Sequence, residues 1–129
     1  MRLPRLLLID DEPVLAEFLA NAARESGYEA TRTVDDETFR REFLENRPDI
    51  VALDLGMPGM DGVELLRFLV DEDYREPVLI VSGFDERVLD SAFRLGEALG
   101  LNMVGPLSKP VRLEDLETML TELRPTLAS

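Results

Sequence analysis

Three carboxylates follow two of the most apolar runs of this chain, and their residue type limits the chemistry they could carry. Asp10 and Asp11 come directly after "RLLLI" (5–9), and Asp54 comes directly after "DIVAL" (49–53). The 129 residues include no cysteine and no histidine, so the usual zinc ligands are missing. Carboxylates alone favour a hard cation such as Mg²⁺. An aspartate can also attack phosphorus and form an aspartyl phosphate.

A hydroxyl and an ammonium group follow two further apolar stretches. Ser82 comes directly after "PVLIV" (77–81), and Lys109 comes shortly after "LNMVGPL" (101–107). Phosphoryl transfer depends mainly on positioning, on cations and on donors aimed at the phosphoryl oxygens. Lys109 offers the cation and Ser82 offers a hydroxyl donor. Together with the carboxylates they predict a metal-assisted phosphorylation site.

Each of these residues has a simpler explanation when it is taken alone. An acidic residue after a strand often caps the next helix, a serine often forms a turn, and a surface lysine is usually solvated. Asp54 is harder to explain in this way, because the loop after it, "LGMPGMDG", is rich in Gly and Pro. The placement of all five residues at the ends of four apolar stretches favours a functional site.

The elements that must position these residues can be read from hydrophobic spacing. The three continuous apolar runs named above are typical of strands covered on both faces. The stretches 28–34 and 101–107 are more polar or contain Pro106, which is typical of edge strands. Apolar residues at helical spacing occupy the segments after each strand, with Asp35 or Asp36 expected to cap the second helix. These helical segments are 14–23, 39–44, 63–69, 88–99 and 113–123.

A strand and a helix repeated five times predict an α/β three-layer sandwich, with a parallel five-stranded sheet between two layers of helices. Placing the three apolar strands in the centre gives the strand order 2-1-3-4-5. Ligands of such sheets bind at the carboxyl ends of the strands, where the order reverses between the first and third strands. All five polar residues would lie at that edge. The chain shows no G-x-G-x-x-G after the first strand and no Walker lysine, so a nucleotide loop is not expected.

Composition narrows the classes of partner. The length suits one domain over residues 1–129. The net charge of −13 argues against direct binding to nucleic acid or to an anionic membrane, and suits cations or basic partner surfaces. No signal-peptide segment and no run of transmembrane length occurs in the sequence. We therefore expect a cytoplasmic protein.

The chain resembles the receiver domain of bacterial two-component response regulators over essentially its whole length. The resemblance is carried by "LLLIDDEP", "DIVALDLGMPGMDG", "PVLIVSGF" and "GPLSKPV", in this order. It implies a flavodoxin-like (βα)₅ fold and a switch phosphorylated by a sensor histidine kinase or a phosphotransfer protein. Asp54 matches the phosphoacceptor, Ser82 the hydroxyl that moves onto the phosphoryl group, and Lys109 the ammonium that pairs with it. Such a domain is not a conventional enzyme, although it promotes its own phosphorylation and dephosphorylation.

The resemblance also implies a Mg²⁺ site. Asp11 matches the residue that binds the ion directly, and Asp10 beside it acts mostly through water. Asp54 and the backbone carbonyl of Gly56 complete the implied ligand set. On this basis, replacing Asp11 with Asn should weaken Mg²⁺ binding more than the same change at Asp10.

One position, Pro106, departs from the family pattern. Pro106 stands three residues before the lysine, where the family commonly has a Tyr or Phe that reports activation. The segment 82–111 resembles receivers attached to cyclic-di-GMP phosphodiesterase regulators of the EAL type. Phosphorylation is expected to change the surface of the fourth helix, fifth strand and fifth helix, which would act on an output domain or effector protein and could form a homodimer. The alternative is a receiver fold kept as an unphosphorylated structural or dimerisation module.

Overall fold

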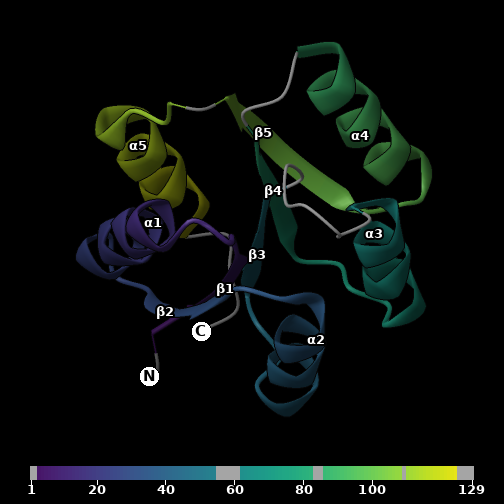
Figure 1. Ribbon diagram of the computed structural model, residues 1–129, viewed down its shortest axis with the longest axis horizontal. Coiled ribbons are helices and arrows are strands. Elements are labelled where there is room, and N and C mark those ends of the chain that lie inside the picture. The colour runs from purple at the N-terminus through teal and green to yellow at the C-terminus, as the bar shows by residue number, and fades with distance from the viewer. Residues whose placement is uncertain (1–2, 55–61, 83–85, 109, 125–129) are drawn as a thin grey trace.

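The computed structural model describes residues 3–54, 62–82, 86–108 and 110–124. Within these ranges strands and helices alternate along the chain (Figure 1). The strands are β1 (Arg5–Ile9), β2 (Glu29–Thr33), β3 (Ile50–Asp54), β4 (Pro77–Ser82) and β5 (Asn102–Ser108). The helices are α1 (Pro13–Glu25), α2 (Asp36–Glu45), α3 (Gly62–Asp71), α4 (Glu86–Ala98) and α5 (Leu113–Leu123). None of the helices in the described part of the chain is long and apolar enough to cross a bilayer.

The strands form one parallel sheet in the order β2-β1-β3-β4-β5, which confirms the predicted order. Every residue of β3 is buried, as are the last four residues of β1. This burial on both faces explains why these runs are continuously apolar. The edge strand β2 has mostly exposed or half-buried residues, in agreement with its polar sequence.

Helices cover both faces of the sheet. In Figure 1, α1 and α5 lie on one side, and α2, α3 and α4 lie on the other. Each side has its own apolar core, formed by one set of strand side chains and the helices over it. On the α2 and α3 side, the ring of Phe43 is fully buried and meets the rings of Phe68 and Tyr74 edge-on, with centroids 5.2 Å apart in both pairs. Full burial of such side chains contributes roughly 1.5–3 kcal/mol each.

Local signals in the sequence determine where two helices begin and end. Asp35 caps α2, because its side chain accepts a hydrogen bond of 2.7 Å from the backbone N–H of Thr38. The structure thus selects Asp35 from the two predicted caps. Gly27 follows α1 with a φ of +93°, and a Cβ there would lie 2.8 Å from the guanidinium carbon of Arg124. Only glycine satisfies both the backbone angle and the space.

The edge strand β5 contains a bulge at the predicted proline. Val104 pairs with Leu79 and Leu107 pairs with Val81, so Gly105 and Pro106 both lie opposite one residue of β4. Gly105 has a φ of +88°, and the peptide bond between these two residues is cis. A residue without an N–H is tolerated here because the strand lies at the edge of the sheet, as predicted.

Candidate functional site

The site is built on the carboxyl ends of two central strands. Ile9 and Leu53 pair in the parallel ladder of β1 and β3, so the next residues, Asp10 and Asp54, emerge side by side at the same edge of the sheet. Both carboxylates are almost completely buried, with exposures of 0% for Asp10 and 3% for Asp54. Charged groups are rarely buried so fully in proteins without a partner or an ion. The predicted meeting of these two residues is therefore present in the structure.

A third carboxylate, that of Glu12, joins them. One carboxylate oxygen from each of Asp10, Glu12 and Asp54 lies within 4.8 Å of the other two. The backbone N–H of Glu12 donates a hydrogen bond of 2.9 Å to Oδ1 of Asp10, which ties the two residues together. Glu12 is the N-cap residue of α1, yet its side chain makes no capping hydrogen bond to that helix. It extends toward the strand ends instead.

Asp11 lies between these residues in the sequence but outside their carboxylate group. Its side chain is exposed, as is that of Glu12, and the described acidic group contains its two neighbours. The chain bends at Asp11, between the end of β1 and the start of α1. Sequence reasoning did not assign Glu12 to the site. The signal available for it was the third consecutive acid of "DDE", directly before the proline that begins α1.

The other predicted site residues are less completely described. Ser82 is the last residue of β4, one position beyond the residue that pairs with Asp54, and it pairs with Ser108 of β5. The structure describes the backbone of Ser82 but not its side chain. Lys109 and Gly56 lie outside the described residues. The roles predicted for these three residues remain predictions.

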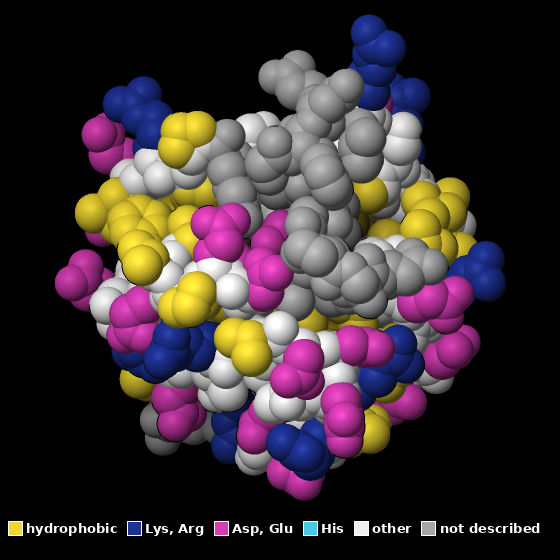
Figure 2. Space-filling view, viewed as in Figure 1, with side chains coloured by type: hydrophobic (Ala, Val, Ile, Leu, Met, Phe, Trp, Pro, Cys, Tyr) yellow, Lys and Arg dark blue, Asp and Glu magenta, His cyan; other side chains and the backbone are white. Residues whose placement is uncertain are grey.

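The electrostatics of the carboxylate group suit a divalent cation. Figure 2 shows acidic side chains gathered near the middle of the viewed face, with hydrophobic side chains on the same face around them. Two like unit charges about 5 Å apart repel by roughly 3 kcal/mol at an effective dielectric constant of about 20. Oxygen ligands about 2.1 Å from an octahedral Mg²⁺ lie roughly 3–4 Å from one another, which is close to the observed grouping. The hard oxygen donors present therefore fit Mg²⁺.

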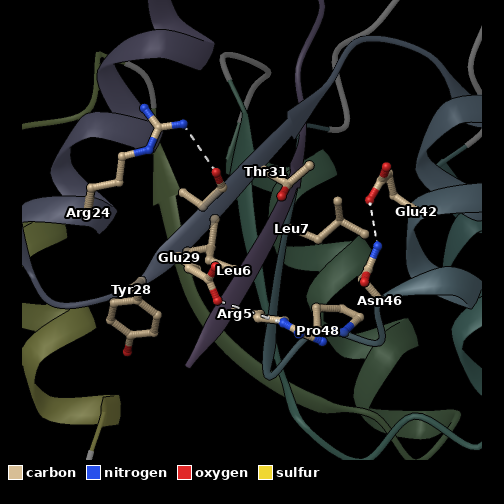
Figure 3. Close-up of a pocket in the computed structure, with 11 residues that line it drawn as sticks. Arg5, Leu6, Leu7, Arg24, Tyr28, Glu29, Thr31, Glu42, Asn46 and Pro48 are labelled. Atoms are coloured by element: carbon tan, nitrogen blue, oxygen red, sulfur yellow. Dashed lines mark hydrogen bonds and ion pairs between the residues drawn. The ribbon is translucent and has the colours of Figure 1, made fainter. Parts of the chain in front are cut away.

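The opposite end of the sheet holds a pocket of about 350 Å³ with a different character (Figure 3). It lies where β1 and β2 begin. Its charged groups are paired with one another or with the backbone: Arg5 Nε lies 3.9 Å from Glu29 Oε2, and Arg24 donates a hydrogen bond of 3.1 Å to the carbonyl oxygen of Ala30. This pairing leaves no excess of one charge to attract a ligand.

A groove of about 420 Å³ runs between α4 and β5. Pro106 and Ser108 line it from β5, and Arg87, Leu89 and Asp90 line it from α4. Pro106 is the position where the family resemblance calls for an aromatic residue. A proline ring has no side-chain rotation comparable to that of Tyr or Phe. A switch that depends on rotating an aromatic ring is therefore not available at this position.

The fold and the acidic site define a class of signalling domain, and comparison with known proteins agrees. The family model described as "Response regulator receiver domain" matches residues 6–121. The chain belongs to this family. The solved structure of a response regulator from Colwellia psychrerythraea is 32% identical, with a TM-score of 0.78, and the match covers 96% of this chain and 98% of that one. The Francisella response regulator 1452 receiver domain is 25% identical, also with a TM-score of 0.78, over 95% of this chain and 98% of that one.

Two curated relatives show how much longer such proteins can be. The transcriptional regulatory protein PrrA of Mycobacterium tuberculosis is 38% identical over 88 residues, which is 66% of this chain and 38% of that protein. The protein-glutamate methylesterase/protein-glutamine glutaminase 2 of Syntrophomonas wolfei is 33% identical over 129 residues, which is 95% of this chain and 36% of that protein. The chain thus spans well under half the length of either relative.

Proposed function

We propose that this domain is a phosphorylation-dependent signalling switch whose phosphoacceptor is Asp54. The observation that carries the proposal is the position of this carboxylate. It is buried at the end of a central strand and grouped with the carboxylates of Asp10 and Glu12, in a chain of the receiver family. It is well placed to react once a cation offsets the charge.

The proposed reaction is a transfer of one phosphoryl group to Asp54. A carboxylate oxygen of Asp54 attacks the phosphorus of a phosphohistidine in a sensor histidine kinase or phosphotransfer protein, or of acetyl phosphate. The new O–P bond forms as the bond to the donor breaks, and the donor's histidine or acetate leaves. Mg²⁺, when bound by the acidic group, would offset negative charge on the phosphoryl oxygens. Ser82 and Lys109 are proposed to bind the phosphoryl group after transfer, as a hydroxyl donor and an ammonium.

The proposed output is a change in the surface formed by α4, β5 and α5. Ser82 ends β4, which pairs directly with β5, so movement at the site can reach the groove between α4 and Pro106. A partner that binds the changed state better by a few kcal/mol would read the signal. We propose that this partner is an output domain or an effector protein, and that a homodimer could use the same surface.

The relatives do not indicate which output domain or effector protein this domain would act on. They include a transcriptional regulator and a methylesterase, which are different activities attached to similar domains. The resemblance of the segment 82–111 to receivers of EAL-type cyclic-di-GMP regulators remains a prediction.

Intact mass spectrometry tests the proposal. The protein is incubated with MgCl₂ and acetyl phosphate, and its mass is compared with that of Asp54→Asn treated in the same way. We expect a gain of one phosphoryl group in the wild type and none in Asp54→Asn. No gain in the wild type, even with a phosphorylated cognate kinase, would favour an unphosphorylated structural or dimerisation module.

A further inference from the structure

We propose that the hydroxyl of Thr33 is a positioning group for the acidic site. It fixes the backbone at the end of β1 and thereby determines where the carboxylate of Asp10 lies. This inference rests on the proposed function, because Asp10 belongs to the group that assists phosphorylation of Asp54. Among the described residues, the buried polar and charged side chains are those of Asp10, Thr33, Asp49 and Asp54. Thr33 is the uncharged member of this set, and its exposure is 3%.

Thr33 holds the end of β1 at two points, one on each side of Ile9. Its hydroxyl donates a hydrogen bond of 2.8 Å to the carbonyl oxygen of Leu8. Its own carbonyl oxygen accepts a hydrogen bond of 3.0 Å from the backbone N–H of Asp10. The two groups on β1 belong to the planar peptide units before and after Ile9. Holding both units against Thr33 fixes the two backbone angles of Ile9 between them, and these angles determine where Asp10 begins.

The position of the backbone at Asp10 is passed on to its carboxylate. Asp10 is the first residue after β1, and the chain bends at the next residue. Its side chain is completely buried, and Oδ1 accepts a hydrogen bond of 2.9 Å from the backbone N–H of Glu12. Closely packed surroundings leave little room for the side chain to correct a displaced backbone. A shift at Asp10 would therefore change the separation of its carboxylate from that of Asp54.

The rival explanation is that this hydroxyl only stabilises the edge strand. Threonine favours strands, and a buried hydroxyl that donates a hydrogen bond contributes to stability wherever it lies. The two explanations differ in what they predict for the site. A purely structural hydroxyl affects phosphorylation only as far as it affects folding, whereas a positioning hydroxyl affects phosphorylation in a protein that is fully folded.

Four single variants separate these explanations. Thr33→Val removes the hydroxyl and keeps the branched shape, and Thr33→Ser keeps the hydroxyl and removes the methyl group. Thr31→Val makes the same change at an exposed position of β2. Tyr28→Phe is the matched control, because it also removes a buried hydroxyl that donates to a carbonyl oxygen, that of Leu120, but does so near the start of the sheet.

Two measurements are made on each variant, after urea unfolding has shown that it is folded and how stable it is. The rate of phosphorylation by acetyl phosphate in MgCl₂ is followed by intact mass. The affinity for Mg²⁺ is followed by NMR shifts of backbone amides during titration with MgCl₂, which requires no phosphorylation.

We expect Thr33→Val to lower the phosphorylation rate and the Mg²⁺ affinity about tenfold each, the lower end of the effects seen when supporting partners of metal-binding side chains are removed. Thr33→Ser should recover most of both, even though the loss of a buried methyl group makes it less stable. Thr31→Val and Tyr28→Phe should react and bind as the wild type does.

Three outcomes would overturn the inference. These are wild-type rate and affinity in Thr33→Val, a loss in Thr33→Ser as large as that in Thr33→Val, or an equal loss in Tyr28→Phe, which would mean that the rate follows stability alone. Each of them is compatible with phosphorylation of Asp54 in the wild type. If the wild type itself gained no phosphoryl group, the proposed function would be wrong, so the two failures are distinguishable.

Discussion

Asp49 and Asp54 stand at the two ends of one buried segment, and they have opposite surroundings. Their exposures are nearly equal, at 5% and 3%. The side chain of Asp49 accepts a hydrogen bond of 2.7 Å from the backbone N–H of Arg5, and the backbone N–H of Asp49 donates one of 2.8 Å to the carbonyl oxygen of Arg5. Asp49 therefore joins the start of β3 to the start of β1. Its negative charge is used to satisfy backbone groups.

At the other end of β3, Asp54 is grouped with two further carboxylates. The groups around Asp49 and around Asp54 differ in the same way. Near the start of the sheet charges are paired, as between Arg5 and Glu29, and the hydroxyl of Tyr74 donates to the carbonyl oxygen of Pro48. Burial alone thus does not identify a functional acid in this fold. Among the described residues, what distinguishes the two is that Asp49 accepts a backbone hydrogen bond whereas Asp54 is grouped with other carboxylates.

The largest effect on stability is expected at Asp49. Asp49→Ala should lower the free energy of unfolding by about 2–3 kcal/mol, because a buried backbone N–H loses a charged acceptor. Urea unfolding followed by circular dichroism measures this change. Phosphorylation of Asp54 should be retained. A loss below about 0.5 kcal/mol would contradict the structural role given to Asp49.

At Asp54, substitution is expected to raise the free energy of unfolding rather than lower it. In buffer without divalent cations, Asp54→Asn should raise the free energy of unfolding by about 1 kcal/mol, because it removes repulsion with the carboxylates of Asp10 and Glu12. Added MgCl₂ should stabilise the wild type, and so reduce the difference in free energy of unfolding between Asp54→Asn and the wild type. The same urea experiment with and without MgCl₂ provides the measurement. Destabilisation as large as that of Asp49→Ala would show that Asp54 also has a structural role.

A pH-dependent effect on stability is expected at Tyr28, near the start of the sheet. Its hydroxyl donates a hydrogen bond of 2.6 Å to the carbonyl oxygen of Leu120. Burial raises the pKa of Tyr28 to about 12, with Arg124 acting to lower it and Asp49 to raise it. Above pH 10 the unfolded chain loses this proton while the folded protein keeps it, so stability falls as the pH rises from about 10 to about 12.

The variant Tyr28→Phe isolates this contribution. It should be about 1 kcal/mol less stable than the wild type at neutral pH, since one buried hydrogen bond is lost. Its stability should then decline less steeply than that of the wild type between pH 10 and 12. Thermal unfolding over this pH range measures both. Parallel pH profiles for the two proteins would mean that Tyr28 titrates normally in the folded state.

Much of this molecule could be predicted from its sequence because its strongest signals are simple. Strands buried on both faces are continuously apolar, so β1 matched the predicted run, β3 was shifted by one residue toward the C-terminus, and β4 was longer by one residue at its end. The polar edge strands then determined the order of the sheet. That order brings Asp10 and Asp54 to one place, because both lie at the carboxyl ends of paired strands.

The details that could not be predicted depend on single backbone angles and on partners distant in sequence. "DDEP" offers three consecutive acids, and which of them approach one another depends on the bend at Asp11 and on the hydrogen bond from the backbone N–H of Glu12 to Oδ1 of Asp10. Asp49 was placed inside a predicted strand, whereas β3 begins one residue later. Its structural role requires the backbone of Arg5, 44 residues earlier, to lie opposite it. No local pattern contains that information.

A paired phosphorylation measurement tests the central comparison most directly. Asp49→Asn and Asp54→Asn are each incubated with MgCl₂ and acetyl phosphate beside the wild type, and the phosphoryl group is counted by intact mass. The account predicts that the wild type and Asp49→Asn each gain one group, while Asp54→Asn gains none. A gain in Asp54→Asn, or no gain in the folded wild type, would contradict the assignment of Asp54 as the phosphoacceptor.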